Sequence, residues 1–214
     1  MARAPRIDIS GYCYHVLNRA NGRARMYESD QHYRAFEELL AEAVETFGIN
    51  ILAYTIMPNH WHLVIQTTHD GQMGESMKWI TQTHTQQHHI EKKTVGTGHL
   101  YQGRYKSFPI ETDSYLVQVI RYVERNPVRA KLVPRAEDWR WGSLWRRTNG
   151  SPRQQELLAP LPTELPYNYL GWVNESEDEE TIGHIRTSLE RSKPLGSEEW
   201  NELLDRGYAR RRKE

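Results

Sequence analysis

Two apolar stretches separated by a tight turn constrain this chain most, because they place a pair of histidines at the start of a strand. Residues 49–57 and 61–67 are rich in branched apolar side chains, which predicts two antiparallel strands joined by a Pro-Asn turn. Side chains two residues apart in a strand point to the same face of the sheet. We therefore expect His60 and His62 to project side by side, with Trp61 turned toward the core.

The histidine pair has two interpretations. Neutral imidazole is the commonest side-chain ligand for metals in proteins, so the pair predicts a metal site. An isolated pair is more often two surface histidines at the start of a strand. The rest of the chain has to decide between the two.

The pattern of apolar residues along the chain predicts the order β-α-β-β-α-β followed by a helix. The strands are expected near residues 12–17, 49–57, 61–67 and 105–110, and the helices near residues 30–47, 71–90 and 115–126. Pro127 should stop the last helix. This order is that of the ferredoxin-like split βαβ fold. We expect an α+β protein with a four-stranded antiparallel sheet and helices on one face, the other face being free for a ligand or a further helix.

The character of the chain changes after Gly150. Residues 1–150 are expected to form the main domain and residues 151–214 a mostly helical C-terminal extension. Residues 1–150 contain 19 of the 28 basic residues and 15 of the 28 acidic residues. Residues 151–214 contain the other nine basic and 13 acidic residues. A mildly basic body with an acidic segment, densest in acid at residues 175–180, is typical of a polyanion binder that carries a self-shielding tail.

Cysteine content and hydropathy restrict the setting of the protein. Cys13 is the single cysteine, so an intrachain disulfide and a four-cysteine zinc site are both excluded. No apolar run approaches the roughly 18–20 residues that span a bilayer. Residues 1–6 contain no apolar segment of the kind found in signal peptides. We expect a cytoplasmic protein with no membrane partner.

The third expected helix offers a tyrosine and a possible third metal ligand. Tyr115, Gln118 and Tyr122 lie on one helical face. A phenol, with a pKa near 10, reacts when a base or a positive charge activates it, and a metal ion would polarise a phosphodiester beside it. Gln118 is the first choice for a third ligand and Glu111 the second. Three protein ligands suit Mg²⁺ or Mn²⁺ better than a closed zinc site, and imidazole favours Mn²⁺.

Basic side chains accompany these groups. The candidates for contact with DNA phosphates are Arg19, Arg104, Lys106, Arg121, Arg125, Arg129 and Lys131. The cations near the end of the third helix could instead reflect the preference of helix C-termini for positive charge. Their proximity to Arg104 and Lys106 favours phosphate binding.

Five short motifs, in this order, resemble the single-tyrosine HUH transposases. More narrowly they are similar to the REP-associated tyrosine transposases, a bacterial branch linked to repetitive extragenic palindromes. The motifs are residues 14–16, 57–64, 103–107, 115–116 and 121–130. The resemblance covers about residues 9–147, and the set is far more specific than any one of its pieces.

The resemblance implies a function. His60 and His62 would bind the metal, and Tyr115 would attack single-stranded DNA to give a 5′-phosphotyrosine link and a free 3′-OH. Strands would be cleaved and rejoined with Mg²⁺ or Mn²⁺ and without a nucleotide cofactor. The ligand would be a hairpin of the REP type next to a short guide sequence. The narrower branch favours a monomer, and related insertion-sequence enzymes leave a dimer open.

The resemblance also sets an expectation for the third ligand, which related enzymes take from the fourth residue after the tyrosine. Counted from Tyr115 that residue is Val119, which cannot bind a metal, so Gln118 is the substitute on geometric grounds. Tyr122 is expected to pack in the core or against substrate rather than to react. His15 is expected to be a packed strand histidine rather than a ligand.

Two other functions fit parts of the sequence. A non-catalytic nucleic-acid-binding module with an RRM-like sheet would stack bases on Tyr12 and Tyr14. A hydrolase that uses the two histidines, a metal and a water nucleophile would not need Tyr115. The acidic extension is expected to regulate access to the site or to contact the hairpin.

Overall fold

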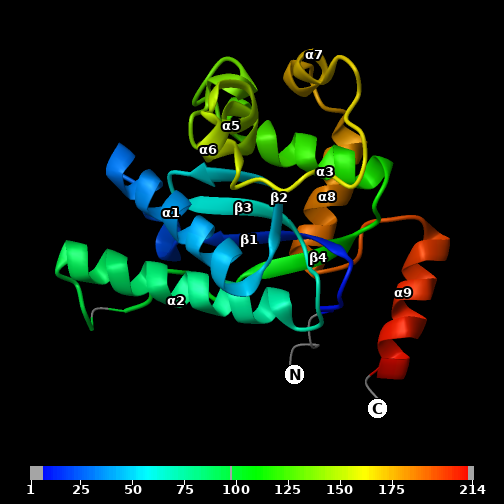
Figure 1. Cartoon of the computed structure of the whole chain (residues 1–214), viewed down its shortest axis with the longest axis horizontal. Helices are drawn as coiled ribbons and strands as arrows, with labels where there is room; N and C mark the ends of the chain where they lie inside the picture. The colour runs from blue at the N-terminus through cyan, green and yellow to red at the C-terminus, as the bar shows by residue number, and fades with distance from the viewer. Residues whose placement is uncertain (1–6, 97, 212–214) are drawn as a thin grey trace.

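The centre of the structure, a computed structural model that describes residues 7–96 and 98–211, is a four-stranded antiparallel sheet. The strands are β1 (Cys13–Arg19), β2 (Asn50–Met57), β3 (His60–Gln66) and β4 (Lys106–Ile110), in the order β2-β3-β1-β4 (Figure 1). This order places the first and third strands at the centre, as the ferredoxin-like fold requires. The predicted fold is confirmed.

Helices cover both faces of the sheet. The two long helices between strands, α1 (Asp30–Phe47) and α2 (Gln72–Lys92), lie on the same face (Figure 1). The opposite face, which the sequence left free for a ligand or a further helix, carries α3 (Ser114–Glu124) and α8 (Glu179–Arg191). The remaining elements of the described part are η1 (Asn21–Arg23), α4 (Asn126–Arg129), η2 (Ala136–Asp138), α5 (Ser143–Asn149), α6 (Pro152–Gln155), α7 (Tyr169–Asn174) and α9 (Glu198–Arg211).

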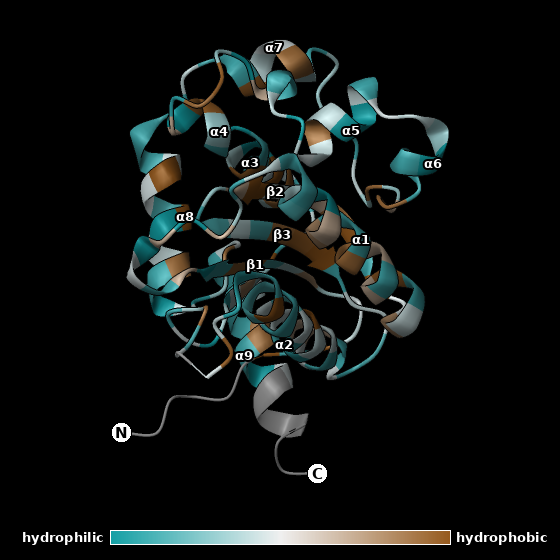
Figure 2. Cartoon of the chain, turned by 90° about the vertical axis from the view of Figure 1, so that its left-hand side faces the viewer, coloured by the Kyte–Doolittle hydropathy of each residue, from teal (hydrophilic) through white to brown (hydrophobic). Residues whose placement is uncertain are grey.

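The alternation of side chains along β3 divides them between two cores. Trp61, Leu63 and Ile65 point to the face of α1 and α2, and all three are fully buried. Val64 points to the opposite face, where it joins a second core with α3 and α8. The strand passes from hydrophilic to hydrophobic along its length (Figure 2). Its hydrophilic start, which holds the two histidines, is therefore the part available for chemistry.

Local signals set the bounds of the helices. Gly48 ends α1 with a φ of 67°, a left-handed conformation that glycine adopts without strain, and its N–H donates to the carbonyl of Val44. The side chain of Asp113 accepts a hydrogen bond from the N–H of Tyr115 and so caps α3. The predicted end of α3 is corrected: the helix ends at Glu124, and Pro127 occupies the first turn of α4, where its missing N–H costs nothing.

The C-terminal extension contributes to the second core. Tyr169, Ile185 and Leu189 are buried there together with side chains of α3 and the sheet. Leu195 exchanges backbone hydrogen bonds with Pro109 and Glu111 at the edge of β4. A domain boundary near Gly150 stays a prediction. Within residues 7–96 and 98–211, no helix has the length and apolar character needed to cross a membrane. Residues 1–6, on which the expectation about a signal segment depends, lie outside the described residues.

A buried carboxylate joins α3 to the elements that follow it. Glu124 is 2% exposed and accepts hydrogen bonds from the hydroxyls of Ser143 and Tyr169, both at 2.6 Å. Arg147 forms an ion pair with the same carboxylate. A buried charge is tolerated when it is paired and its lone pairs are satisfied, as they are here. Glu124 therefore fixes α5 and α7 to the end of the helix that also reaches the histidines.

Replacing Glu124 with Ala should destabilise the protein by about 3–5 kcal/mol, because Arg147 and two hydroxyls lose their buried partner. Urea unfolding followed by circular dichroism measures the change. Glu180→Ala, at an exposed position of α8, is the matched control and should leave the midpoint nearly unchanged. An equal effect of the two substitutions would contradict the structural role of Glu124.

Candidate functional site

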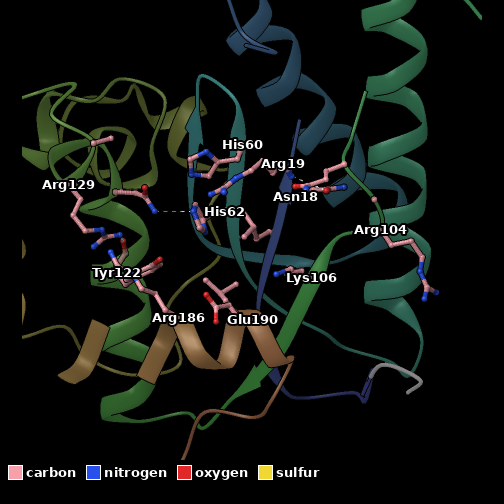
Figure 3. A pocket seen from close by; sticks show the side chains of 16 residues that line it. Asn18, Arg19, His60, His62, Arg104, Lys106, Tyr122, Arg129, Arg186 and Glu190 are labelled. Carbon is pink, nitrogen blue, oxygen red and sulfur yellow. Dashed lines mark hydrogen bonds between the residues drawn. The ribbon is translucent and has the colours of Figure 1, made fainter. Parts of the chain in front are cut away.

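A cavity of about 690 Å³ lies where β1 ends and β3 begins. Its walls come from β1, β3, the start of β4, the loop before β4, the junction of α3 with α4, and α8 (Figure 3). The lining residues are Leu17, Asn18, Arg19, His60, His62, Gln102, Gly103, Arg104, Lys106, Tyr122, Asn126, Arg129, Ala130, Arg186, Leu189 and Glu190. Cations and imidazoles dominate this wall, so it suits an anionic ligand.

The two histidines lie on the face of the sheet that the sequence predicts. In the pairing of β1 with β3, Arg19 stands opposite His60 and Leu17 opposite His62. The two imidazole rings are 5.0 Å apart between centroids and inclined by 78°. Trp61, on the opposite face, is fully buried, as expected from the alternation. The strand geometry thus turns a sequence spacing of two into a pair of adjacent nitrogen ligands.

Both ring nitrogens of His62 have partners. Nδ1 is 2.8 Å from Nε2 of His15, and Nε2 is 3.0 Å from Nδ2 of Asn126. His15 is fully buried, so it is a packed strand histidine as predicted, and it also orients His62. When Nδ1 of His62 carries the proton and donates to His15, Nε2 presents its lone pair toward Asn126. A second residue that fixes the tautomer in this way is typical of histidines that bind metals.

Burial keeps these imidazoles neutral. It lowers the pKa of His60 to about 4, with Arg19 and Arg129 adding to the effect. It lowers the pKa of His62 well below the ordinary value of 6.5, and the neighbouring His15 and His60 add to this. His15 has its pKa lowered to about 3 by burial and by Arg129. A neutral imidazole keeps one unprotonated nitrogen that can bind a cation, so the pair suits a metal ion near neutral pH.

The tyrosine beside the histidines is Tyr122, in the last turns of α3. Its ring centroid is 6.0 Å from that of His62 and 6.0 Å from that of His15, with the rings edge to face. The guanidinium carbon of Arg129 lies 4.1 Å from the centroid of the Tyr122 ring. Tyr122 is 6% exposed and lines the cavity, as Figure 3 shows.

The structure does not bring Tyr115 and Gln118 to the histidines. Tyr115 lies in the first turn of α3, seven residues or about 10 Å of helix before Tyr122, and it packs against the second core. Gln118 lines a separate hollow with Trp172 and residues 163–167. Neither residue lines the cavity. Glu111, the second choice as a ligand, instead accepts hydrogen bonds from Ser197.

The predicted DNA-binding cations separate into two groups. Arg19, Arg104 and Lys106 line the cavity, and within the described part of the chain none of them forms an ion pair with an acid. Arg121 and Arg125 instead hold the chain between α7 and α8. Arg129 does both, since it lines the cavity and pairs with an acid of that segment. Lys131 is exposed outside the cavity.

The donor set at the cavity fits an open divalent-cation site. In the portion of the chain that is described, no three His, Cys, Asp or Glu side chains gather as metal ligands. A carboxamide is a ligand of a different kind, and Asn126, 9% exposed, offers one: its Nδ2 lies 3.0 Å from Nε2 of His62, which places the amide group beside the ring. Two neutral imidazoles and one amide oxygen would leave the remaining coordination positions of Mg²⁺ or Mn²⁺ to phosphate and water.

In the part of the chain that the structure describes, neither face of the sheet is open for bases to stack on it. Tyr14 is fully buried, and its hydroxyl hydrogen-bonds with the backbone of Ile9. Tyr12 is partly buried beside Trp200, with ring centroids 6.0 Å apart. Both faces of the sheet carry helices. The binding-module alternative therefore lacks the open sheet that it requires.

Sequence reasoning missed several residues of the cavity. Tyr122 and Asn126 are four residues apart, which is the spacing expected between the tyrosine and the third ligand, and this signal was available. Gln102 and Gly103 come from the loop that precedes β4. Arg186 and Glu190 come from α8, and no motif in the extension points to them.

Comparisons with known proteins found a matching family and similar solved structures. A family model described as "Transposase IS200 like" matches residues 8–126. One similar solved structure is a REP-associated tyrosine transposase bound to a REP hairpin, with 18% identity, a TM-score of 0.60, and coverage of 83% of this chain and 93% of that chain. Another is a candidate transposase from Deinococcus radiodurans R1, with 16% identity, a TM-score of 0.42, and coverage of 57% and 96%. None of the curated proteins matches the sequence.

Acidification should destabilise the protein through these buried histidines. A group whose pKa is lowered in the folded state binds its proton first in the unfolded chain, so stability falls as pH drops from about 6.5 toward 4. In that window, each such histidine lowers the free energy of unfolding by at most about 1.4 kcal/mol per pH unit of acidification. Urea unfolding at pH 7, 6 and 5 measures the total.

His60→Gln should remove the contribution of one histidine, so the free energy of unfolding should fall less steeply as the pH drops. His69→Gln, which replaces an exposed histidine, is the matched control and should leave the curve unchanged. Parallel curves for wild type and His60→Gln would show that His60 is not held neutral by burial.

Proposed function

Because this chain belongs to the IS200-like transposase family, we propose that it cleaves and rejoins single-stranded DNA next to a hairpin of the REP type. The observation that carries the proposal is the convergence of Tyr122, Asn126 and two neutral histidines in one cationic cavity. A nucleophile, cation ligands and phosphate-binding groups then occupy the same space. This is the set that a metal-assisted phosphoryl transfer requires.

Tyr122 is the proposed nucleophile, in place of the Tyr115 expected from the sequence. The support is positional, since Tyr122 lines the cavity that holds His60 and His62. Spacing adds to it: the fourth residue after Tyr122 is Asn126, whose side chain already contacts His62. With Tyr115 the fourth residue is Val119, which is fully buried and has no ligand atom.

The proposed cleavage replaces the proton of the phenol by a phosphoryl group. Oη of Tyr122 attacks the phosphorus, an O–P bond forms to tyrosine, and the bond from phosphorus to the 3′ oxygen breaks. The 3′ oxygen leaves as a hydroxyl and takes up the proton that balances the one lost by the phenol. Rejoining is the reverse reaction, in which a 3′-hydroxyl attacks the phosphotyrosine. No external energy source is consumed, because one phosphodiester-type bond replaces another.

His60, His62 and Asn126 are the proposed holders of Mg²⁺ or Mn²⁺. The ion would polarise a non-bridging oxygen of the scissile phosphate and stabilise the charge of the transition state. The chain's own contribution is to keep the imidazoles neutral by burial and to fix His62 through His15. Trp61 holds the strand from the opposite face, so the ligands are attached to a rigid element.

Arg19, Arg104 and Lys106 are the proposed contacts to the DNA backbone. They lie on the side of the cavity formed by β1, β4 and the preceding loop, across from Tyr122 (Figure 3). Phosphate contacts of this kind supply most of the affinity without reading the sequence. A hairpin as ligand is supported by the similar structure that was solved with a REP hairpin. We propose that the chain acts as a monomer, with residues 1–150 as the catalytic domain that supplies the tyrosine and the cation ligands.

Tyr122→Phe should abolish cleavage, with a loss of about 10³-fold or more, because no phenol oxygen remains to attack phosphorus. Tyr115→Phe, on the same face of the same helix, should cleave at nearly the wild-type rate. The measurement is the covalent adduct between the protein and a hairpin oligonucleotide that carries its label on the 3′ side of the cleaved bond, formed with Mn²⁺ and resolved on denaturing gels. The reverse ranking of the two variants would return the nucleophile to Tyr115.

The same experiment separates this proposal from a hydrolase that uses water. Such an enzyme would cut the oligonucleotide without trapping the label on the protein, and both tyrosine variants would remain active. Cleavage by wild type without any adduct would therefore refute the tyrosine mechanism. A complete lack of cleavage on hairpins that the protein binds would refute the proposed activity.

Asn126→Ala should raise the Mn²⁺ concentration needed for half-maximal cleavage by about 10–100-fold, since one of three donors is lost. His60→Ala and His62→Ala should remove cleavage altogether. Hairpin affinity in EDTA should change little for all three, because phosphate contacts dominate it. Gln118→Ala is the control, and a larger effect of this variant than of Asn126→Ala would restore Gln118 as the ligand.

A further inference from the structure

Three arginines spaced four residues apart hold the segment between α7 and α8. Nη2 of Arg121 donates to the carbonyl oxygens of Glu175 and Ser176, at 3.0 and 3.5 Å. Nη2 of Arg125 lies 3.4 Å from the carbonyl oxygen of Asn174. These arginines were expected to bind DNA. The structure instead occupies them with the chain's own C-terminal segment.

The third arginine is tied to this segment through a buried acid. The carboxylate of Glu177 forms ion pairs with Arg129 and, at 3.6 Å, with Arg125. The side chain of Glu177 is 3% exposed, and those of Arg129 and Arg125 are 17% and 13% exposed. A carboxylate this buried is retained only where its charge is paired, so the contact is a fixed part of the fold.

Arg129 connects this acid to the reactive tyrosine. Its guanidinium lies over the Tyr122 ring at 4.1 Å, and its Nη2 donates to the Tyr122 carbonyl oxygen at 2.8 Å. Its Nη1 is the atom that pairs with Glu177. The planar guanidinium of Arg129 therefore contacts a carboxylate, a carbonyl oxygen and the face of a ring at the same time. A lysine could not make the same contacts, because its ammonium group lacks this fixed planar arrangement of donors.

We propose that Glu177 is a positioning residue for catalysis, because it holds Arg129 against the ring of Tyr122. The inference rests on the proposed role of Tyr122 as nucleophile. In the cavity the natural partner of a guanidinium is the phosphate of the substrate. Glu177 supplies a competing, buried anion, so Arg129 stays on the ring when DNA enters. The phenol then keeps the orientation that in-line attack requires, and a nearby positive charge accompanies the negative charge that develops on its oxygen.

If Glu177 has this role, the C-terminal extension forms part of the active site and does not merely restrict access to it. Arg186 and Glu190 of α8 line the same cavity, and α8 begins directly after the segment that holds Glu177. Tyr169, Ile185 and Leu189 bury the extension in the second core. Deleting the extension would expose that core, so the test needs point substitutions in the full chain.

The decisive variant is Glu177→Gln, which keeps the shape of the side chain and removes its charge. Single-turnover formation of the protein–DNA adduct, at saturating hairpin and Mn²⁺, should slow by about 10-fold or more, since small displacements of a reacting group are costly. The dissociation constant for the hairpin in EDTA should change by less than about twofold, because Glu177 is buried and does not line the cavity. A loss in rate at constant affinity is the signature of positioning.

Two further variants complete the experiment. Arg129→Lys keeps the charge but loses the planar group, and it should slow adduct formation as Glu177→Gln does. Glu180→Gln removes an exposed acid from the start of α8 and should react at the wild-type rate. Thermal melting of each variant measures the folded fraction at the assay temperature, and rates are compared only between variants that are folded there. If Glu177→Gln is unfolded there, Arg129→Lys alone decides.

The outcomes separate this inference from its premise. Adduct formation by Glu177→Gln and Arg129→Lys at the wild-type rate would overturn it. Faster reaction of Glu177→Gln would also overturn it, and would show that the segment restrains the enzyme. If wild type forms no adduct, or Tyr122→Phe forms one, the proposed nucleophile is wrong and the positioning role falls with it.

Discussion

The packing of α3 across the histidine-bearing face of the sheet is the constraint on which the site depends. The hydroxyl of Thr55 on β2 donates to the carbonyl oxygen of Val123 at 2.8 Å, and Asn126 reaches His62 at 3.0 Å. Earlier in the same helix, Leu116, Val119 and Ile120 are fully buried in the second core. Because helix and sheet are both stiff, the helix residues that meet the histidines are fixed by where α3 docks rather than by which residue is chemically suited.

The fold could be predicted from the sequence because its signals are local. Branched apolar residues predicted the strands, and the expected helices near residues 30–47 and 115–126 match α1 and most of α3. The end of α3 was predicted less well, since Pro127 is tolerated in the first turn of a new helix. The helices on the second face were left open, because the burial of α8 depends on contacts between residues far apart in the sequence.

The site could be predicted only in part, for a related reason. His60 and His62 follow from strand alternation, which is a local rule. Tyr115 and Tyr122 are seven residues apart and share one helical face, so periodicity cannot say which end of the helix meets the sheet. The spacing of four residues between Tyr122 and Asn126 supports the proposed nucleophile, but in the sequence this spacing was counted only from Tyr115. Arg186 and Glu190 had no signal, since only the tertiary packing of α8 brings them to the cavity.

The distribution of charge shows how a chain of zero net charge can present a cationic cavity. The sequence indicated a basic body with an acidic, self-shielding segment, and Glu177 does pair with Arg125 and Arg129. This pairing is local, so it leaves Arg19, Arg104 and Lys106 facing the cavity without acidic partners among the described residues. Net charge therefore says little about this site. In the function proposed above, Glu177 pairs with Arg125 and Arg129 and so positions Tyr122, while the cations that line the cavity without an acidic partner contact phosphate.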